Sequence, residues 1–82
     1  PVASLLPSTH PRIAIANKNV PNMVAQISSV LSSEKINILD MVNTSRDDIA
    51  YTLLDTDRVP NEKALAQLRA IDGVIRVRVL RG

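Results

Sequence analysis

Four asparagines are the residues of this sequence whose type and spacing could bind a small molecule. Asn17, Asn19 and Asn22 lie close together, and Asn37 follows further along the chain. A carboxamide carries both donors and an acceptor without a charge. Pro21 suits the first turn of a helix, where free backbone N–H groups favour an anion. The turn could therefore hold a small zwitterion such as an amino acid, or its amides could simply cap and satisfy the backbone.

Other polar residues offer weaker chemistry. His10 is the only histidine, and with no partner near it in sequence we interpret it as a solvated linker residue. The adjacent acids Asp47 and Asp48 could hold a metal, but adjacent charges between two strands are typical of a solvated turn. Arg76 and Arg78 alternate along a predicted strand, which allows either phosphate binding or a solubilising surface.

The composition excludes several classes of protein. The chain has 82 residues, 45% of them hydrophobic, and a net charge of +2 with scattered basic residues. This indicates one small domain without a nucleic-acid footprint. Without cysteine there are no disulfides, thiolate zinc sites or thiol catalysis, which fits a cytoplasmic protein. No apolar run approaches the roughly 18 residues of a membrane span.

Neither the glycines nor the aromatic residues support catalysis or RNA recognition. The two glycines, Gly73 and Gly82, cannot form a phosphate-binding loop at the first turn. One tyrosine and no phenylalanine or tryptophan argue against bases stacked on a sheet. No Ser–His–acid or Cys–His arrangement is present. We therefore expect no catalytic residue, metal or cofactor in this chain.

Apolar periodicity predicts six elements. They are a strand at 12–16, a helix from 21 to about 34–35, strands at 36–45 and 49–56, a helix from 60 to about 72, and a strand at 74–80. The proline-rich segment 1–11 is predicted to be a linker or arm from a preceding domain.

This order predicts an α+β, ferredoxin-like βαββαβ fold. Its antiparallel four-stranded sheet would carry both helices on one face. The first and last strands would be central or adjacent, and the second strand would lie at an edge. For the helix-covered face we predict Ile13, Ile15, Tyr51, Leu53, Ile75, Val77 and Val79. For the opposite face we predict Ala14, Ala16, Leu39, Met41 and Leu54.

Two surfaces of this predicted fold are expected to contact another subunit or domain. The face opposite the helices is too apolar for a solvated sheet, so we expect partial cover by another subunit or domain. A long edge strand favours pairing with its own copy. A homodimer with a continuous sheet, formed through an edge strand and the first helix, is the expected assembly.

Four stretches carry a resemblance to a known family. They are RIAIANKNVPNMV at 12–24, INILDM at 36–41, IAYTLLD at 49–55 and IDGVIRVR at 71–78. They resemble the ACT domain, and more narrowly the C-terminal regulatory domain of D-3-phosphoglycerate dehydrogenases, NAD-dependent oxidoreductases that open serine biosynthesis. The resemblance covers 12–80. Its more specific motif is the Asn-x-Pro turn followed by an Ile-Asn-Ile strand start.

The resemblance implies a regulatory role and a site. In that family the domains pair side by side and L-serine, a feedback inhibitor, binds between subunits, while NAD belongs to the catalytic domain ahead of them. Asn19 of one subunit and Asn37 of the other would accept from the serine ammonium group. The implied ligand-binding residues are Asn17, Asn19, Pro21, Asn22, Met23 and Asn37, with the backbone N–H groups near Asn22 and Met23 receiving the carboxylate.

The chain departs from the serine-responsive members of that family at three positions. Asn17 stands where those members typically have His, and Asn22 and Lys35 stand where they typically have Gly. Two alternatives therefore stay open. The domain could be an oligomerisation module of the same enzyme without a ligand site, or a nucleic-acid-binding βαββαβ domain.

Overall fold

The computed structural model describes residues 10–81. Its elements are β1 (Pro11–Lys18), α1 (Met23–Ser33), β2 (Ile38–Arg46), β3 (Ile49–Thr56), α2 (Glu62–Ala70) and β4 (Val74–Arg81). The predicted βαββαβ order is confirmed. Residues 1–9 of the predicted linker lie outside the described residues, and its last residue, Pro11, already belongs to β1. Within residues 10–81 no helix is long and apolar enough to cross a membrane.

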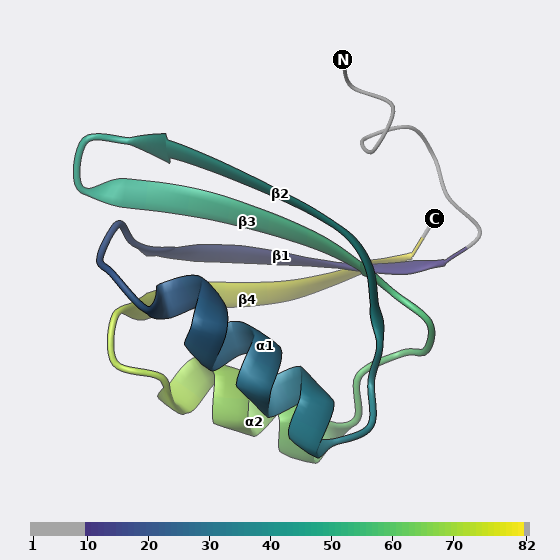
Figure 1. Cartoon of the computed structure of the whole chain (residues 1–82). Coiled ribbons are helices and arrows are strands. Elements are labelled where there is room, and N and C mark those ends of the chain that lie inside the picture. Colours follow the sequence, from purple (N-terminus) through teal and green to yellow (C-terminus); the bar gives the residue numbers. More distant parts are fainter. Residues whose placement is uncertain (1–9, 82) are drawn as a thin grey trace.

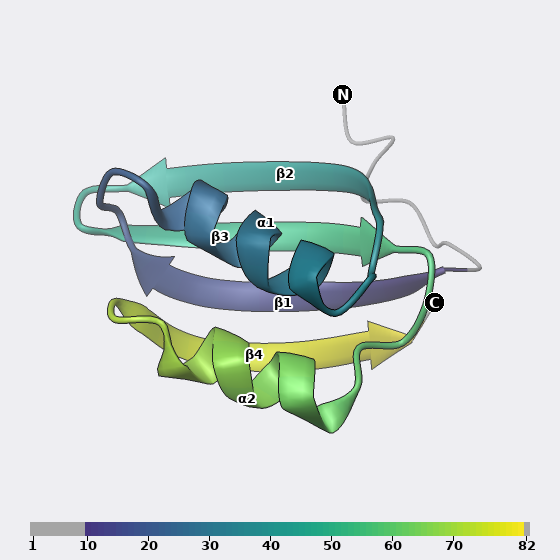
Figure 2. The same ribbon diagram turned by 60° about the horizontal axis from the view of Figure 1, so that its bottom comes forward.

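The four strands form one antiparallel sheet in the order β2-β3-β1-β4. β1 and β3 are central, and β2 and β4 form the edges, as expected for the second strand. Both helices lie on one face of the sheet (Figures 1 and 2), with α2 over β4. The other face of the sheet carries no element within residues 10–81, so its side chains define an open face.

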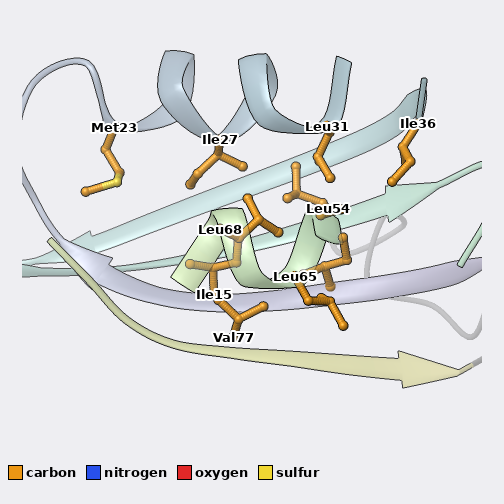
Figure 3. Close-up of a cluster of buried hydrophobic side chains, with 11 residues drawn as sticks. Ile15, Met23, Ile27, Leu31, Ile36, Leu54, Leu65, Leu68 and Val77 are labelled. Atoms are coloured by element: carbon orange, nitrogen blue, oxygen red, sulfur yellow. The ribbon is translucent and has the colours of Figure 1, made fainter. Parts of the chain in front are cut away.

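The core lies between the sheet and the helices (Figure 3). On α1, Met23, Ile27 and Leu31 recur at helical spacing and are buried. α2 contributes Ala64, Leu65 and Leu68. These side chains meet those of the strands, and the buried apolar strand residues are Ile13, Ile15, Ala50, Leu54 and Val77. One apolar stripe per helix and one apolar face of the sheet are thus enough to close the core.

Each helix begins two residues after the proline at which the sequence analysis placed its start. Asn22, which precedes α1, is in the left-handed region at φ 70°, so regular helix geometry starts only at Met23. Before α2, the Oδ1 of Asn61 accepts a hydrogen bond from the backbone N–H of Ala64 at 2.8 Å. Each proline therefore sets up the turn, and an asparagine between it and the helix makes the boundary.

The side chains of β3 alternate in the opposite phase to the prediction, so that each lies on the other face of the sheet. Tyr51, expected under the helices, is 58% exposed, whereas Leu54, expected on the other face, is fully buried. Leu53 is also on the open face, and Thr52 takes the covered position. The prediction failed because it followed apolarity alone. A buried threonine whose hydroxyl is hydrogen-bonded is compatible with a core position.

Two irregularities in the edge strands explain why Ile75 and Met41 also lie on the face of the sheet opposite to the predicted one. The register of β4 against β1 shifts near Ile75, which is 57% exposed although Val77 is buried as predicted. The register of β2 against β3 shifts at Leu39, so Met41, expected on the open face, packs against the core. One extra residue reverses the alternation of a strand, and no turn residue marks either position in the sequence.

Replacing Leu54 tests the corrected phase of β3. Leu54→Ala leaves a cavity under both helices and is expected to lower the free energy of unfolding by about 2–5 kcal/mol. The matched change Leu39→Ala, at a side chain that is 49% exposed, is expected to cost less than about 1 kcal/mol. Urea unfolding followed by circular dichroism measures both. Equal losses would contradict the assignment of faces.

Candidate functional site

The β1–α1 turn is fixed by backbone contacts to two other turns. The backbone N–H of Asn19 donates to the carbonyl of Asp48 at 2.7 Å, and its side-chain Nδ2 donates to the carbonyl of Asp47 at 3.2 Å. Lys18 N–H donates to the carbonyl of Gly73 at 2.7 Å. Within residues 10–81 the Oδ1 of Asn19 accepts no hydrogen bond. The turn thus holds one amide oxygen available in a fixed position.

The N-terminus of α1 lacks the groups that usually neutralise it. The side chain of Asn22 makes no capping hydrogen bond, and the first turn contains no acidic residue. Uncapped N–H groups at a helix start attract anions. Met23 is buried through its side chain, so only its backbone N–H can serve a ligand. Pro21 is exposed in the turn and fixes its φ.

Asn17 lies inside β1, not in the turn where the sequence placed it, and its side chain is 1% exposed. A chain of hydrogen bonds crosses three strands at this point. Asn43 Nδ2 donates to Thr52 Oγ1 at 2.8 Å, and Thr52 Oγ1 donates to Asn17 Oδ1 at 3.1 Å. Asn17 Nδ2 donates to the carbonyl of Lys18 at 2.9 Å. Asn17 therefore fixes the end of β1 from which the turn begins.

Sequence reasoning did not identify Thr52 and Asn43 as part of this network. Thr52 is fully buried, and a polar residue at a covered position must find a partner. Asn43 is exposed on the neighbouring strand β2 and donates to Thr52. The signal was present in the alternation of β3, in which Thr52 and Thr56 share the phase of Leu54. It could be used only once the covered face was known.

Removing the hydroxyl of Thr52 tests the network. Thr52→Val keeps the shape of the side chain but leaves Asn17 Oδ1 buried without a donor. The expected loss is about 1–3 kcal/mol of unfolding free energy. Thr44→Val, at an exposed position on β2, is the matched control and is expected to be nearly neutral. Denaturant midpoints measure the difference, and an unchanged midpoint for Thr52→Val would show that the network contributes nothing.

Asn37 lies just before β2 and is held by one carboxylate. Its backbone N–H donates to Asp57 Oδ1 at 3.0 Å and its Nδ2 donates to Asp57 Oδ2 at 3.1 Å. In return, the backbone N–H of Asp57 donates to the carbonyl of Asn37. The pKa of Asp57 is lowered, first by the hydrogen bond from the Asn37 backbone and then by the charge of Arg58. The Asn37 amide oxygen accepts no hydrogen bond within residues 10–81.

The lowered pKa of Asp57 makes the Asn37 contact sensitive to acid. A carboxyl whose pKa is lower in the folded protein stabilises the fold above its ordinary value of 3.8. That contribution is lost as the pH falls through the folded pKa. Asp57→Asn is therefore expected to lower the urea midpoint at neutral pH, and the gap from the wild type should shrink below about pH 4. Asp72→Asn, at an exposed position, is the control. A gap independent of pH would contradict the assignment.

A single chain does not bring Asn19 and Asn37 together. Asn19 precedes α1 and Asn37 follows it (Figure 1). The helix has 11 residues, which corresponds to about 16 Å at 1.5 Å per residue. The predicted residues thus form two half-sites. One half-site contains the Asn19 oxygen and the uncapped N-terminus of α1, and the other contains the Asn37 oxygen.

Comparison with solved structures identifies the fold. The chain is similar to the ACT domain from GTP pyrophosphokinase of Chlorobium tepidum, with a TM-score of 0.70, 27% identity and coverage of 85% of this chain and 95% of that one. It also resembles the C-terminal domain of the MgtC protein from Mycobacterium tuberculosis, with a TM-score of 0.71, 19% identity and coverage of 90% and 88%.

A third similar structure is a homoserine dehydrogenase from Thiobacillus denitrificans, with a TM-score of 0.74 and 23% identity. The match covers 89% of this chain but only 17% of that one. Neither a protein-family model nor a curated protein sequence matches the chain. The chain has the ferredoxin-like fold of ACT domains, and the similarity to D-3-phosphoglycerate dehydrogenase rests on the sequence resemblance alone.

Proposed function

We propose that this chain is a regulatory ACT domain that binds an amino acid, L-serine, between two copies of itself. We further propose that it forms the C-terminal part of a D-3-phosphoglycerate dehydrogenase in serine biosynthesis. The similarity to a solved ACT domain at 27% identity supports the first part. The resemblance of 12–80 to the regulatory domains of those dehydrogenases supports the second.

The observation that carries the proposal is that the uncapped N-terminus of α1 follows the same turn that holds the Asn19 amide in place. The serine carboxylate would bind the free N–H groups at Asn22 and Met23, where the helix dipole favours a negative charge. The ammonium group would donate to the Asn19 oxygen. Both charges of the amino acid are then matched by groups that the fold already holds in place.

A two-fold axis beside α1 would complete the site. If this axis is perpendicular to α1, it places the two α1 helices antiparallel, so that the start of one lies beside the end of the other. Asn37 of the second copy would then supply the second oxygen for the ammonium group. The free edge of β2 is available to pair with its copy, which extends the sheet across the dimer as the sequence predicts.

Ligand binding at such an interface gives the domain a regulatory use. Serine held by two subunits stabilises one arrangement of the pair over others, and only this difference in affinity can act on a distant active site. NAD would bind to the catalytic domain. The turn after β1 reads Asn-Val-Pro-Asn at 19–22 and has no glycine that would let a dinucleotide phosphate approach the backbone.

A second candidate function is an oligomerisation module of the same enzyme with no ligand. Two observations favour it. Asn22 carries a side chain in the left-handed conformation that glycine adopts without strain, and this side chain stands where a ligand would approach. Asn17 is already satisfied by Thr52 and Lys18. Such a module would form the same dimer but would not respond to amino acids.

Calorimetric titration with L-serine distinguishes the two functions. Under the first proposal serine binds, and Asn19→Ala and Asn37→Ala each weaken binding by about tenfold, because each removes a hydrogen bond to a charged group. Asn22→Gly is expected to tighten binding by opening the approach to the backbone. Gln67→Ala, which alters an amide on α2, is the control.

Sedimentation of the same samples separates the outcomes. A dimer that releases no heat with serine, including in the Asn22→Gly variant, would support the oligomerisation module. A chain that stays monomeric and binds no serine at millimolar concentration would remove both functions.

A further inference from the structure

The open face of the sheet contains a hollow of about 430 Å³. Its floor is formed on β1 by Ala14 and Ala16, and its sides carry Tyr51 and Leu53 on β3 and two arginines on β4. β1 thus contributes small side chains to this face and β3 contributes large ones. The large side chains of β3 therefore form a ridge, and this ridge runs beside a groove over the small side chains of β1.

We propose that this face packs against the same face of a second copy, with β1 of each chain over β3 of the other. This interface is separate from the β2 edge and α1, and it does not depend on the serine site. It concerns the side of the sheet that the helices leave uncovered.

The strand register makes the face complementary to itself. Ala14 is the direct partner of Leu53, and Ala16 is the direct partner of Tyr51. Consider a two-fold axis parallel to the strands that lies midway between the two sheets, above the line between β1 and β3. It places β1 of each chain over β3 of the other, and it keeps each row of paired residues at the same position along the strands. Leu53 then faces Ala14 of the second copy, and Tyr51 faces its Ala16. Each large side chain fills the space above a small one, as in packed sheets.

The charges on this face fit the same arrangement. Arg12 Nε forms an ion pair with Asp55 Oδ1 at 2.6 Å, and the pair lies one row beyond Ala14 and Leu53. Under the same two-fold operation Arg12 of one chain faces Asp55 of the other, so that opposite charges alternate. At the edges β4 of one chain lies over β2 of the other, so that Arg78 faces Val42 and Leu80 faces Asp40 of the second copy. No row in this arrangement sets like charges directly opposite each other.

The size of the face indicates how strong the contact is. Four strands at about 4.8 Å and eight residues at about 3.3 Å give a face of roughly 500 Å². Two such faces bury about 1,000 Å², which lies at the low end for specific interfaces. The expected dimer is therefore weak and depends on protein concentration. Because it leaves the β2 edge free, it can coexist with an edge-to-edge dimer.

Tyr51 makes the proposal directly measurable. It is the only aromatic residue in the sequence, and its side chain stands on the proposed interface. We expect acrylamide quenching of its fluorescence to fall several-fold as the 82-residue chain is concentrated from micromolar to millimolar. Sedimentation of the same samples should show the mass of the species doubling over the same range, from monomer to dimer or from edge-to-edge dimer to tetramer.

A pair of variants assigns the effect to this face. Ala14→Arg fills the hollow with a charged side chain and is expected to abolish the face-to-face association and the protection of Tyr51, while leaving pairing through the β2 edge unchanged. Ala66→Arg makes the same change at an exposed position on α2 and should behave as the wild type. Circular dichroism confirms that each variant is folded. A third variant, Leu53→Ala, removes a ridge residue and should weaken association without adding charge.

Three results would overturn the proposal. A chain that remains monomeric with accessible Tyr51 shows that the face is solvated. A dimer in which Tyr51 stays fully quenchable shows association elsewhere, such as at the β2 edge, and leaves the proposed function intact. Protection of Tyr51 at all concentrations in a monomer shows that another segment of the chain covers the face.

Discussion

The strict alternation of β1 is the constraint on which the rest of the structure depends. β1 is hydrogen-bonded to β3 on one side and to β4 on the other, so neither its register nor its facing can shift without disrupting both. Ile13, Ile15 and Asn17 therefore point under the helices. The alternate residues, including Ala14 and Ala16, form the floor of the open face.

The same strand connects the core to the candidate site. Asn17 is the last covered residue of β1, and its hydrogen bonds with Thr52 and Lys18 fix the end of the strand just before the turn that carries Asn19. The turn is further fixed to the β2–β3 hairpin through Asp47 and Asp48. A buried polar network of this kind contributes position as well as stability. The uncapped start of α1 is consequently presented on a rigid support and not on a free loop.

Much of the fold could be predicted from the sequence because periodicity is a local signal. The order of elements, the bounds of β3 and the edge position of β2 are confirmed. The phase of β3 could not be predicted from apolarity, because Tyr51 and Leu53 on one face outweigh Leu54 on the other, where the neighbours in phase are Thr52 and Thr56. The bulges at Leu39 and Ile75 depend on how neighbouring strands pair, which the sequence shows only indirectly.

The candidate site was predicted only in part. The turn at Asn19 and the position of Asn37 beside the start of β2 follow from local patterns. The burial of Asn17, and the clamp that Asp57 forms on Asn37, depend on contacts between segments far apart in the sequence. The pairing of the two half-sites belongs to a second copy, and it stays a prediction.

The account makes one central claim, that the start and the end of α1 from two chains share one amino acid. Titration of isotope-labelled protein with L-serine, followed by amide chemical shifts, tests it directly. Residues around Asn19 to Met23 and around Asn37 should shift together, at the same serine concentration and more strongly at high protein concentration. Shifts confined to one end of α1, or absent from both, would contradict the shared site.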